Sequence, residues 1–129
     1  MGKKKNFLKG EEGFTLIEII AVLIILGILA AVAIPRYIDL TANAENRAID
    51  AGIAELNGRE ALTWANIKIS TAGYVDDAAT FAVVSTDLGA DYTWSVAPTV
   101  AGGTVDFGSQ AVALTRTAST TTAPGRWAR

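Results

Sequence analysis

The hydrophobic positions of this chain fall into three successive patterns, and the first is a long apolar run. Residues 19–34 contain no polar side chain, and the apolar character already begins at Phe14, interrupted only by Thr15 and Glu18. The stretch from Phe14 to residue 34 approaches the roughly 20 residues that a helix needs to cross the hydrocarbon core of a membrane. The pattern therefore predicts a single membrane-spanning helix over residues 14–34.

Beyond Pro35 the apolar residues recur at spacings of three and four, which is typical of an amphipathic helix. These positions are Ile38, Ala42, Ile49, Ile53, Leu56 and Trp64, with charged residues between them. Pro35 cannot donate a backbone hydrogen bond and should kink the helix. We expect one long helix over residues 14–67, kinked at Pro35, whose second half has an apolar stripe that needs a partner.

The third pattern consists of short runs rich in β-branched and aromatic residues, separated by turn residues. After a loop at 70–80, these runs cover 81–85, 92–97, 104–108 and 111–117, and the polar tail that follows should be loose or pair at an edge. About sixty residues without a disulfide rarely fold alone. We therefore expect an α+β fold in which a small antiparallel sheet of three or four strands, within residues 68–129, packs on the helix stripe.

Charge is unevenly distributed around the predicted span. The first 13 residues carry a net charge of +2, whereas residues 14–129 carry −4. Positively charged flanks stay in the cytoplasm, so the larger part of the chain should face the outer side of the membrane. An acidic exterior also argues against nucleic acid as a partner, because phosphate contacts need basic clusters.

The chain contains no cysteine and no histidine. Their absence excludes Cys–His and Ser–His nucleophiles and the usual zinc ligands, and stability must come from packing alone. No pocket is expected in so small a sheet, so an enzymatic function is not predicted.

Two interpretations of the N-terminus compete. A cleaved secretory signal would have basic residues, an apolar segment and a small-x-small site such as Ala31–Ala33. Against it stand the acidic Glu11, Glu12 and Glu18, the length of the apolar run, and Pro35 just past the cut. The alternative, a span that is retained, is favoured.

The string "GFTLIE", from Gly13 to Glu18, follows a short basic leader and precedes an apolar run that ends in a proline. In these features the chain resembles type IV pilins and the pseudopilins of type II secretion. The resemblance implies that residues 1–13 are a leader, removed by a prepilin peptidase that cuts after Gly13 and methylates the new amine of Phe14. Glu18 and Pro35 then match the family's glutamate and helix-kinking proline.

The resemblance also implies a role. The chain would be a structural subunit that sits in the bacterial inner membrane, its C-terminal region in the periplasm, and polymerises with its own copies through an assembly platform. The product would be a surface pilus or, as the alternative, a periplasmic pseudopilus that drives protein export. The family's C-terminal disulfide loop, common in pilins but missing in many pseudopilins, has no counterpart here. A third alternative is an anchored domain that never polymerises.

Glu18 allows two interpretations, because a charge at this depth in a bilayer costs at least about 2.5 kcal/mol and needs a partner. It could cap its own helix or pair with its own amine, one turn away. It could instead pair with the amine of a neighbouring subunit and set the register of assembly. Gly27 belongs to a small-residue face, with Ala31 four residues on, where helices could approach closely.

A metal site is the remaining chemistry that the residues suggest. Aspartates cluster in the C-terminal region at positions Asp76, Asp77, Asp87, Asp91 and Asp106. Ca²⁺ takes about 6 to 8 oxygen ligands, and this spacing fits no defined calcium loop. We therefore expect no cofactor, with calcium as the less favoured alternative.

Overall fold

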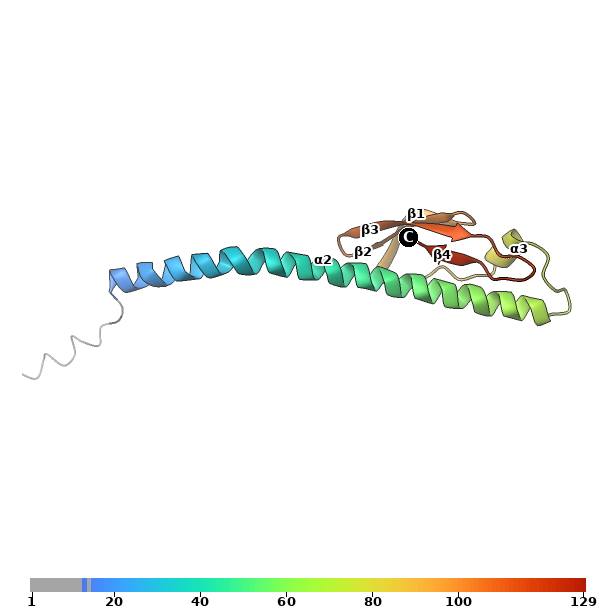
Figure 1. Cartoon of the computed structure of the whole chain (residues 1–129), viewed down its shortest axis with the longest axis horizontal. Helices are drawn as coiled ribbons and strands as arrows, with labels where there is room; N and C mark the ends of the chain where they lie inside the picture. The colour runs from blue at the N-terminus through green and yellow to red at the C-terminus, as the bar shows by residue number, and fades with distance from the viewer. Residues whose placement is uncertain (1–12, 14) are drawn as a thin grey trace, which may run out of the picture. The chain divides into compact units, whose positions relative to one another are not determined.

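The computed structural model describes residue 13 and residues 15–129, and Figure 1 shows their arrangement along the chain. Residues 1–12 of the predicted leader and the predicted new N-terminus Phe14 lie outside the described residues. The elements in chain order are α2 (Leu16–Ile69), α3 (Asp77–Phe81), β1 (Tyr92–Thr99), β2 (Gly102–Phe107), β3 (Gln110–Thr117) and β4 (Arg126–Ala128). The chain divides into two compact units, one ending at Asp39 and one spanning Leu40–Arg129.

Helix α2 is the long helix that the sequence predicts. It spans 54 residues and ends at Ile69, two residues beyond the expected end. Pro35 lies inside it, so the carbonyl of Ala31 lacks its usual helical N–H donor. The helix continues through this position, and the kink stays a prediction.

The sheet has four antiparallel strands in the order β1-β2-β3-β4. Strand β2 pairs with β3 without a register shift, with Val105 opposite Val112, and β4 adds three pairs at the edge of β3, with Arg116 opposite Trp127. The meander confirms the predicted strands at 92–97, 104–108 and 111–117. The expectation of edge pairing in the tail is also confirmed, because β4 lies there.

The predicted strand over 81–85 is wrong. Asp76 caps a short helix by accepting a hydrogen bond from the backbone N–H of Ala79 at 2.7 Å, and this helix, α3, ends at Phe81. The chain then continues through turns, and Val84 is buried without joining the strand ladder. The predicted loop at 70–80 is correspondingly shorter, because α3 begins within it.

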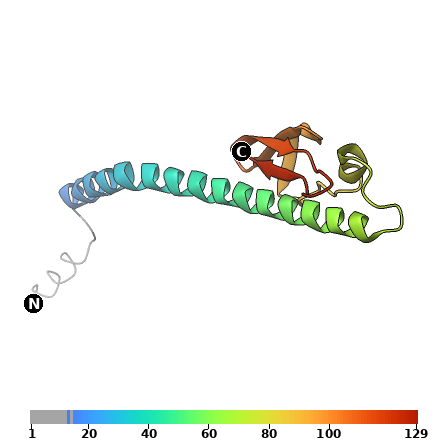
Figure 2. The same cartoon turned by 45° about the vertical axis from the view of Figure 1, so that its right-hand side comes forward.

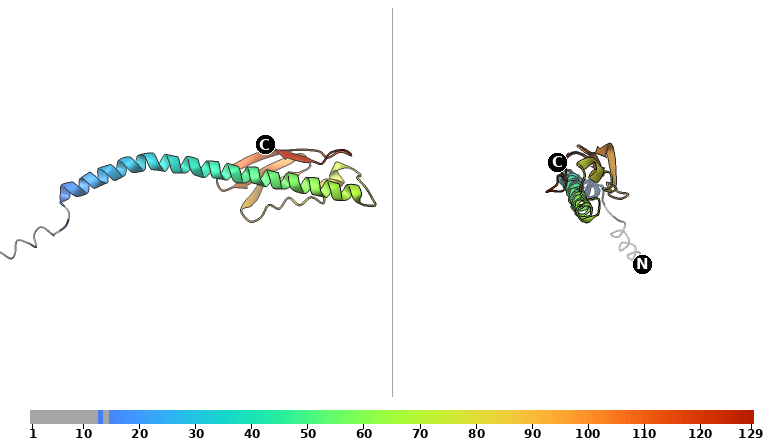
Figure 3. Two further views of the ribbon diagram at one scale, coloured as in Figure 1. Left: turned by 60° about the horizontal axis from the view of Figure 1, so that its bottom comes forward. Right: turned by 90° about the vertical axis from the view of Figure 1, so that its right-hand side faces the viewer.

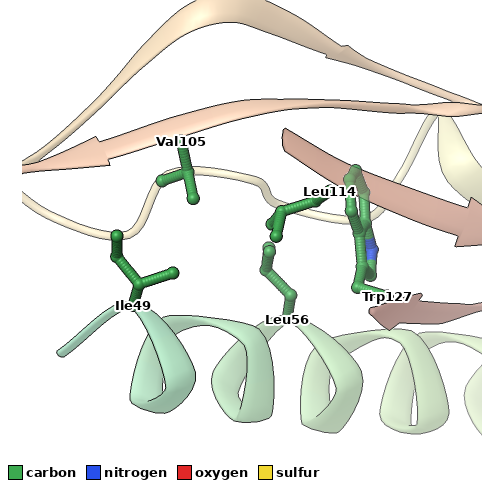
Figure 4. Close-up of a cluster of buried hydrophobic side chains, with 5 residues drawn as sticks. All are labelled: Ile49, Leu56, Val105, Leu114 and Trp127. Atoms are coloured by element: carbon green, nitrogen blue, oxygen red, sulfur yellow. The ribbon is translucent and has the colours of Figure 1, made fainter. Parts of the chain in front are cut away.

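The core of the second unit lies between α2 and the sheet. Figure 4 shows its buried apolar side chains pointing toward one another from the two layers: Ile49, Leu56, Val105, Leu114 and Trp127. In Figures 2 and 3 the sheet follows one side of the C-terminal half of α2. The structure therefore confirms an α+β fold in which a four-stranded sheet packs on the amphipathic half of the helix, as in the pilin fold.

Candidate functional site at the start of the helix

Glu18 and Thr15 form a reciprocal cap at the N-terminus of α2. The backbone N–H of Thr15 donates to Oε2 of Glu18 at 2.7 Å, and the backbone N–H of Glu18 donates to Oγ1 of Thr15 at 3.3 Å. Thr15 immediately precedes the first helical residue, and Glu18 is the third residue of the helix. This capping box satisfies two N–H groups near the helix start that have no intrahelical partner. Glu18 therefore caps its own helix within one chain, which is the first of the two interpretations of this residue.

Gly13 is exposed and has a φ angle of 98°, a conformation that other L-residues rarely adopt. No heavy atom of the described residues lies within 4 Å of the position that a Cβ would take. The residue on the N-terminal side of the predicted cut therefore lies outside the helix in open space. Phe14, on the other side, is not described.

The first half of α2 is apolar on every side and exposed on every side. Its large apolar residues from Leu16 to Ile34 have exposed fractions between 42% and 77%. Within the described part of the chain, α2 is the one helix that is long and apolar enough to cross a membrane. A helix that is hydrophobic all round must be covered by lipid or by protein. No described residue of the first unit supplies that cover.

Gly27 and Pro35, the other two predicted assembly residues, both lie on this exposed helix. A Cβ at Gly27 would meet no described atom within 4 Å. The position therefore leaves room for close approach by another helix, although the chain itself provides no such neighbour among the described residues.

The second unit contains a buried cluster of charges that the sequence pattern does not predict. Glu60, one of the charged residues between the apolar positions of the amphipathic helix, is fully buried and binds the guanidinium of Arg116 in β3. The two bonds join Nε of Arg116 to Oε1 of Glu60 at 2.5 Å and Nη2 to Oε2 at 3.0 Å. Asp77 at the start of α3 binds the same guanidinium. The partners are 56 and 39 residues apart in sequence, so no local pattern could have revealed them.

The pKa values in this cluster follow from the hydrogen bonds. The bonds from Arg116, aided by those from Ser119, lower the pKa of Asp77 from 3.8 to about 2, although partial burial acts in the opposite direction. Burial opposes the charge of Arg116, but the hydrogen bonds to Glu60 and Asp77 outweigh it and raise the pKa of the guanidinium. Asp77 and Arg116 therefore stay charged at neutral pH, and the cluster serves stability.

The aspartates considered for calcium do not converge. Asp76 caps α3, Asp77 binds Arg116, Asp87 accepts from the backbone N–H of Gly89, and Asp106 accepts from the hydroxyl of Ser95. Among the described residues no group of three acidic side chains is placed to hold a metal ion. The expectation about calcium stays a prediction.

The N-terminal motif, the exposed apolar half-helix and the helix-on-sheet unit together define a class of protein: an α+β subunit with the pilin fold. The family model described as the prokaryotic N-terminal methylation motif matches residues 8–34 of this chain. This match covers the predicted cleavage position and the predicted span.

Known proteins of this class resemble the chain mainly in its N-terminal part. The type IV narrow pilus major component of Thermus thermophilus is 42% identical over 57 residues, which are 44% of this chain and 49% of that protein. A fimbrial protein of Pseudomonas aeruginosa is 55% identical over 38 residues, or 30% of this chain and 25% of the relative. A type IV major pilin of Neisseria gonorrhoeae is 60% identical over 35 residues, or 27% and 21%.

The matches span about half the length of the first of these relatives and a quarter or less of the other two. No solved structure matches the chain. In its N-terminal motif and in its helix-on-sheet fold, the chain is similar to type IV pilins.

Proposed function

We propose that this chain is a structural subunit of a type IV pilus and polymerises through the apolar half of α2. In this proposal a prepilin peptidase cuts between Gly13 and Phe14 and methylates the amine of Phe14. The processed subunit then waits in the inner membrane, with its second unit in the periplasm, until an assembly platform adds it to the filament.

The observation that carries the proposal is the exposure of the large apolar side chains between Leu16 and Ile34. Lipid can cover this surface before assembly, and the same half-helices of other copies can cover it afterwards. Because lipid tails and apolar helices are similarly apolar surroundings, the transfer from membrane to filament need not be costly. A subunit that never polymerised would keep this surface in contact with lipid and would not need to bury it against other helices.

Glu18 supports assembly without giving up its local role. The cap occupies Oε2, and no hydrogen bond from the described residues reaches Oε1. A carboxylate accepts about four hydrogen bonds, so Oε1 can receive a neighbouring subunit's amine while the cap stays intact. The two interpretations of Glu18 are therefore compatible: the cap fixes the carboxylate at the helix end, and the neighbour's amine neutralises it.

A pseudopilin is the second candidate. It is favoured by the absence of cysteine from the C-terminal region, which rules out the disulfide loop that many pilins have. Both candidates share the cleavage, the membrane-embedded intermediate and the helix bundle. They differ in the location of the filament, which is the cell surface for a pilus and the periplasm for a pseudopilus, and in that a pseudopilus drives protein export.

Shear fractionation of cells that produce this protein separates the candidates. A pilus subunit should appear in processed form in the sheared surface fibres, and deletion of the gene should remove those fibres. A pseudopilin should remain with the cell envelope, and its deletion should block secretion of an exported protein. An anchored domain would stay in the membrane fraction, and chemical cross-linking would give no ladder of its own copies. That result would contradict both proposals.

A further inference from the structure

The loop between β3 and β4, residues 118–125, is held in place by hydrogen bonds and hardly at all by apolar packing. Its sequence, ASTTTAPG, has no large apolar side chain, and only Ser119 and Gly125 are buried. A cavity of about 380 Å³ is lined by Asn57 and residues 123–126, so packing around the second half of the loop is incomplete. Segments with few apolar contacts open most readily.

Side chains from the end of α2 and the segment after it hold this loop by its backbone. Trp64 donates from Nε1 to the carbonyl of Thr120, and Lys68 donates from Nζ to the carbonyl of Thr121, both at 2.8 Å. The hydroxyl of Tyr74 donates to the carbonyl of Ser119, also at 2.8 Å. Each of these side chains reaches one carbonyl of the loop, and the Tyr74 hydroxyl also lies 3.2 Å from the hydroxyl of Ser119.

Asp77 makes the densest attachment of the loop. Its Oδ1 accepts from the backbone N–H of Ser119 at 2.6 Å and from the Ser119 hydroxyl at 2.8 Å. The same carboxylate accepts from Nη1 and Nη2 of Arg116 at 2.8 and 2.9 Å. Asp77 thereby joins the loop and the start of α3 to the side chain of a β3 residue through charge-assisted bonds, which are stronger than neutral ones.

The charges of the cluster show that Asp77 is not needed to keep Arg116 neutralised. Glu60 and Arg116 already form a neutral, bidentate pair, and both side chains are 0% exposed. Asp77 adds a surplus negative charge, and its side chain is 18% exposed. If the bonds between Asp77 and Arg116 break, Arg116 retains its bonds to Glu60 and to the carbonyl of Val100. Water can replace the lost bonds, because the side chain of Asp77 is partly exposed.

We propose that Asp77 is a latch, which fastens the 118–125 loop onto the buried Glu60–Arg116 pair and can open while that pair and the helix–sheet core stay intact. Thr117 and Arg126 act as the two ends of the opening segment, because each belongs to a strand. Trp127 remains in the core, since its backbone N–H and carbonyl are both bound by the side-chain amide of Asn57. The loop is then the part of the second unit that can change shape without unfolding.

Amide hydrogen exchange on the full chain in detergent tests this latch, with Asp77→Asn as the variant and Asp76→Asn as the matched control. Asn at position 76 can still cap α3, and that residue does not touch Arg116 or Ser119. The amides of residues 118–123, Ser119 above all, should exchange about tenfold faster or more in Asp77→Asn and less than twofold faster in Asp76→Asn. In both variants the β2–β3 ladder should exchange more slowly than the loop.

Two results would overturn the latch. If the loop and the β2–β3 ladder of the parent exchange at one common rate, with one common dependence on urea, the loop opens only when the whole unit unfolds. If Asp77→Asn leaves the exchange of Ser119 unchanged, the bonds from Trp64, Lys68 and Tyr74 hold the loop without the carboxylate.

Discussion

At the scale of single residues, the two oxygens of the Glu18 carboxylate have different surroundings. Oε2 receives the backbone N–H of Thr15, and Oε1 has no donor among the described residues. The distinction matters for mutagenesis, because a substitution at this position removes a local cap and a candidate intersubunit contact together. Filament yield and subunit processing must therefore be measured side by side.

We expect Glu18→Ala and Glu18→Gln to lower filament yield strongly and to leave membrane insertion and leader removal largely intact. The neighbour's amine, with an ordinary pKa near 7.7 to 8.0, would lose its partner in an apolar bundle, a loss of about 3 kcal/mol or more. Glutamine can still accept a hydrogen bond from the Thr15 N–H, so Glu18→Gln removes the charge and keeps the helix cap. The ratio of sheared filaments to processed membrane subunit is the quantity to compare, and a normal ratio in Glu18→Gln would reduce Glu18 to a helix cap.

Two glycines of the second unit should respond in opposite directions to alanine. A Cβ at Gly125 would lie 2.5 Å from Nη2 of Arg116 and 2.6 Å from Oε2 of Glu60, where both side chains are fully buried. Gly125→Ala should therefore lower the free energy of unfolding by about 1–3 kcal/mol. Gly58→Ala, in an open position on α2, should raise it by about 0.5–1 kcal/mol. Urea unfolding midpoints measure both, and equal effects would mean that the buried pair tolerates a methyl group.

At the scale of secondary-structure elements, the apolar periodicity was sufficient to predict α2 and most of the sheet. The stripe positions Ile49 and Leu56 are both fully buried against the sheet, and three of the predicted strands exist. Ile38, assigned to the same stripe, is instead exposed. Periodicity alone does not tell where the partner of a stripe ends.

Elements whose conformation depends on distant partners were not predictable. Residues 81–85 read as a strand because they are apolar, but the Asp76 cap and burial of Val84 place them in a helix end and turns. Strand β4 forms from only three residues, because the edge of β3 and the side chain of Asn57 bind its backbone. Glu60 looked like a surface residue because its partner Arg116 is 56 positions away.

The packing of the sheet on α2 predicts how shortened chains behave. A chain that begins at Arg36 should fold, since it keeps Ile49, Leu56 and Glu60 and omits the exposed apolar half-helix. A chain that begins at Ser70 should be unfolded, because the sheet would lose one wall of its core and Arg116 would lose its buried partner. Circular dichroism melts compare them, and a cooperative melt of the shorter chain at the same temperature would refute the shared core.

The second unit should also lose stability in acid in a defined range. Asp77 has a folded pKa of about 2, below its ordinary 3.8, so its contribution is complete above that ordinary value and disappears as the pH falls from about 4 to about 2. The loss is on the order of 2 kcal/mol. Urea midpoints of the chain from Arg36 should fall over this range in the parent by more than in Asp77→Asn. Parallel curves for the two proteins would mean that Asp77 does not titrate as described.

At the scale of the whole molecule, the two units have different proposed roles, assembly for the first and a stable folded domain for the second. The first presents an apolar helix with a capped carboxylate at its start, and the second is a compact helix-on-sheet unit with a buried ion pair in place of any disulfide. Stability of the second unit and assembly through the first should therefore vary independently. We expect substitutions at Gly125 or Asp77 to change unfolding, and substitutions at Glu18 to change the filament yield.

The proposed subunit begins at Phe14 once it is part of a filament, and mass spectrometry of sheared surface fibres measures where it begins. We expect an N-terminal peptide that starts at Phe14, carries one methyl group on its amine, and is the main form of this chain in the fibres. An intact Met1, or an N-terminus at Ile34 created by a cut after Ala33, would contradict it, because the first would leave the leader on the helix and the second would remove the helix that is proposed to build the filament.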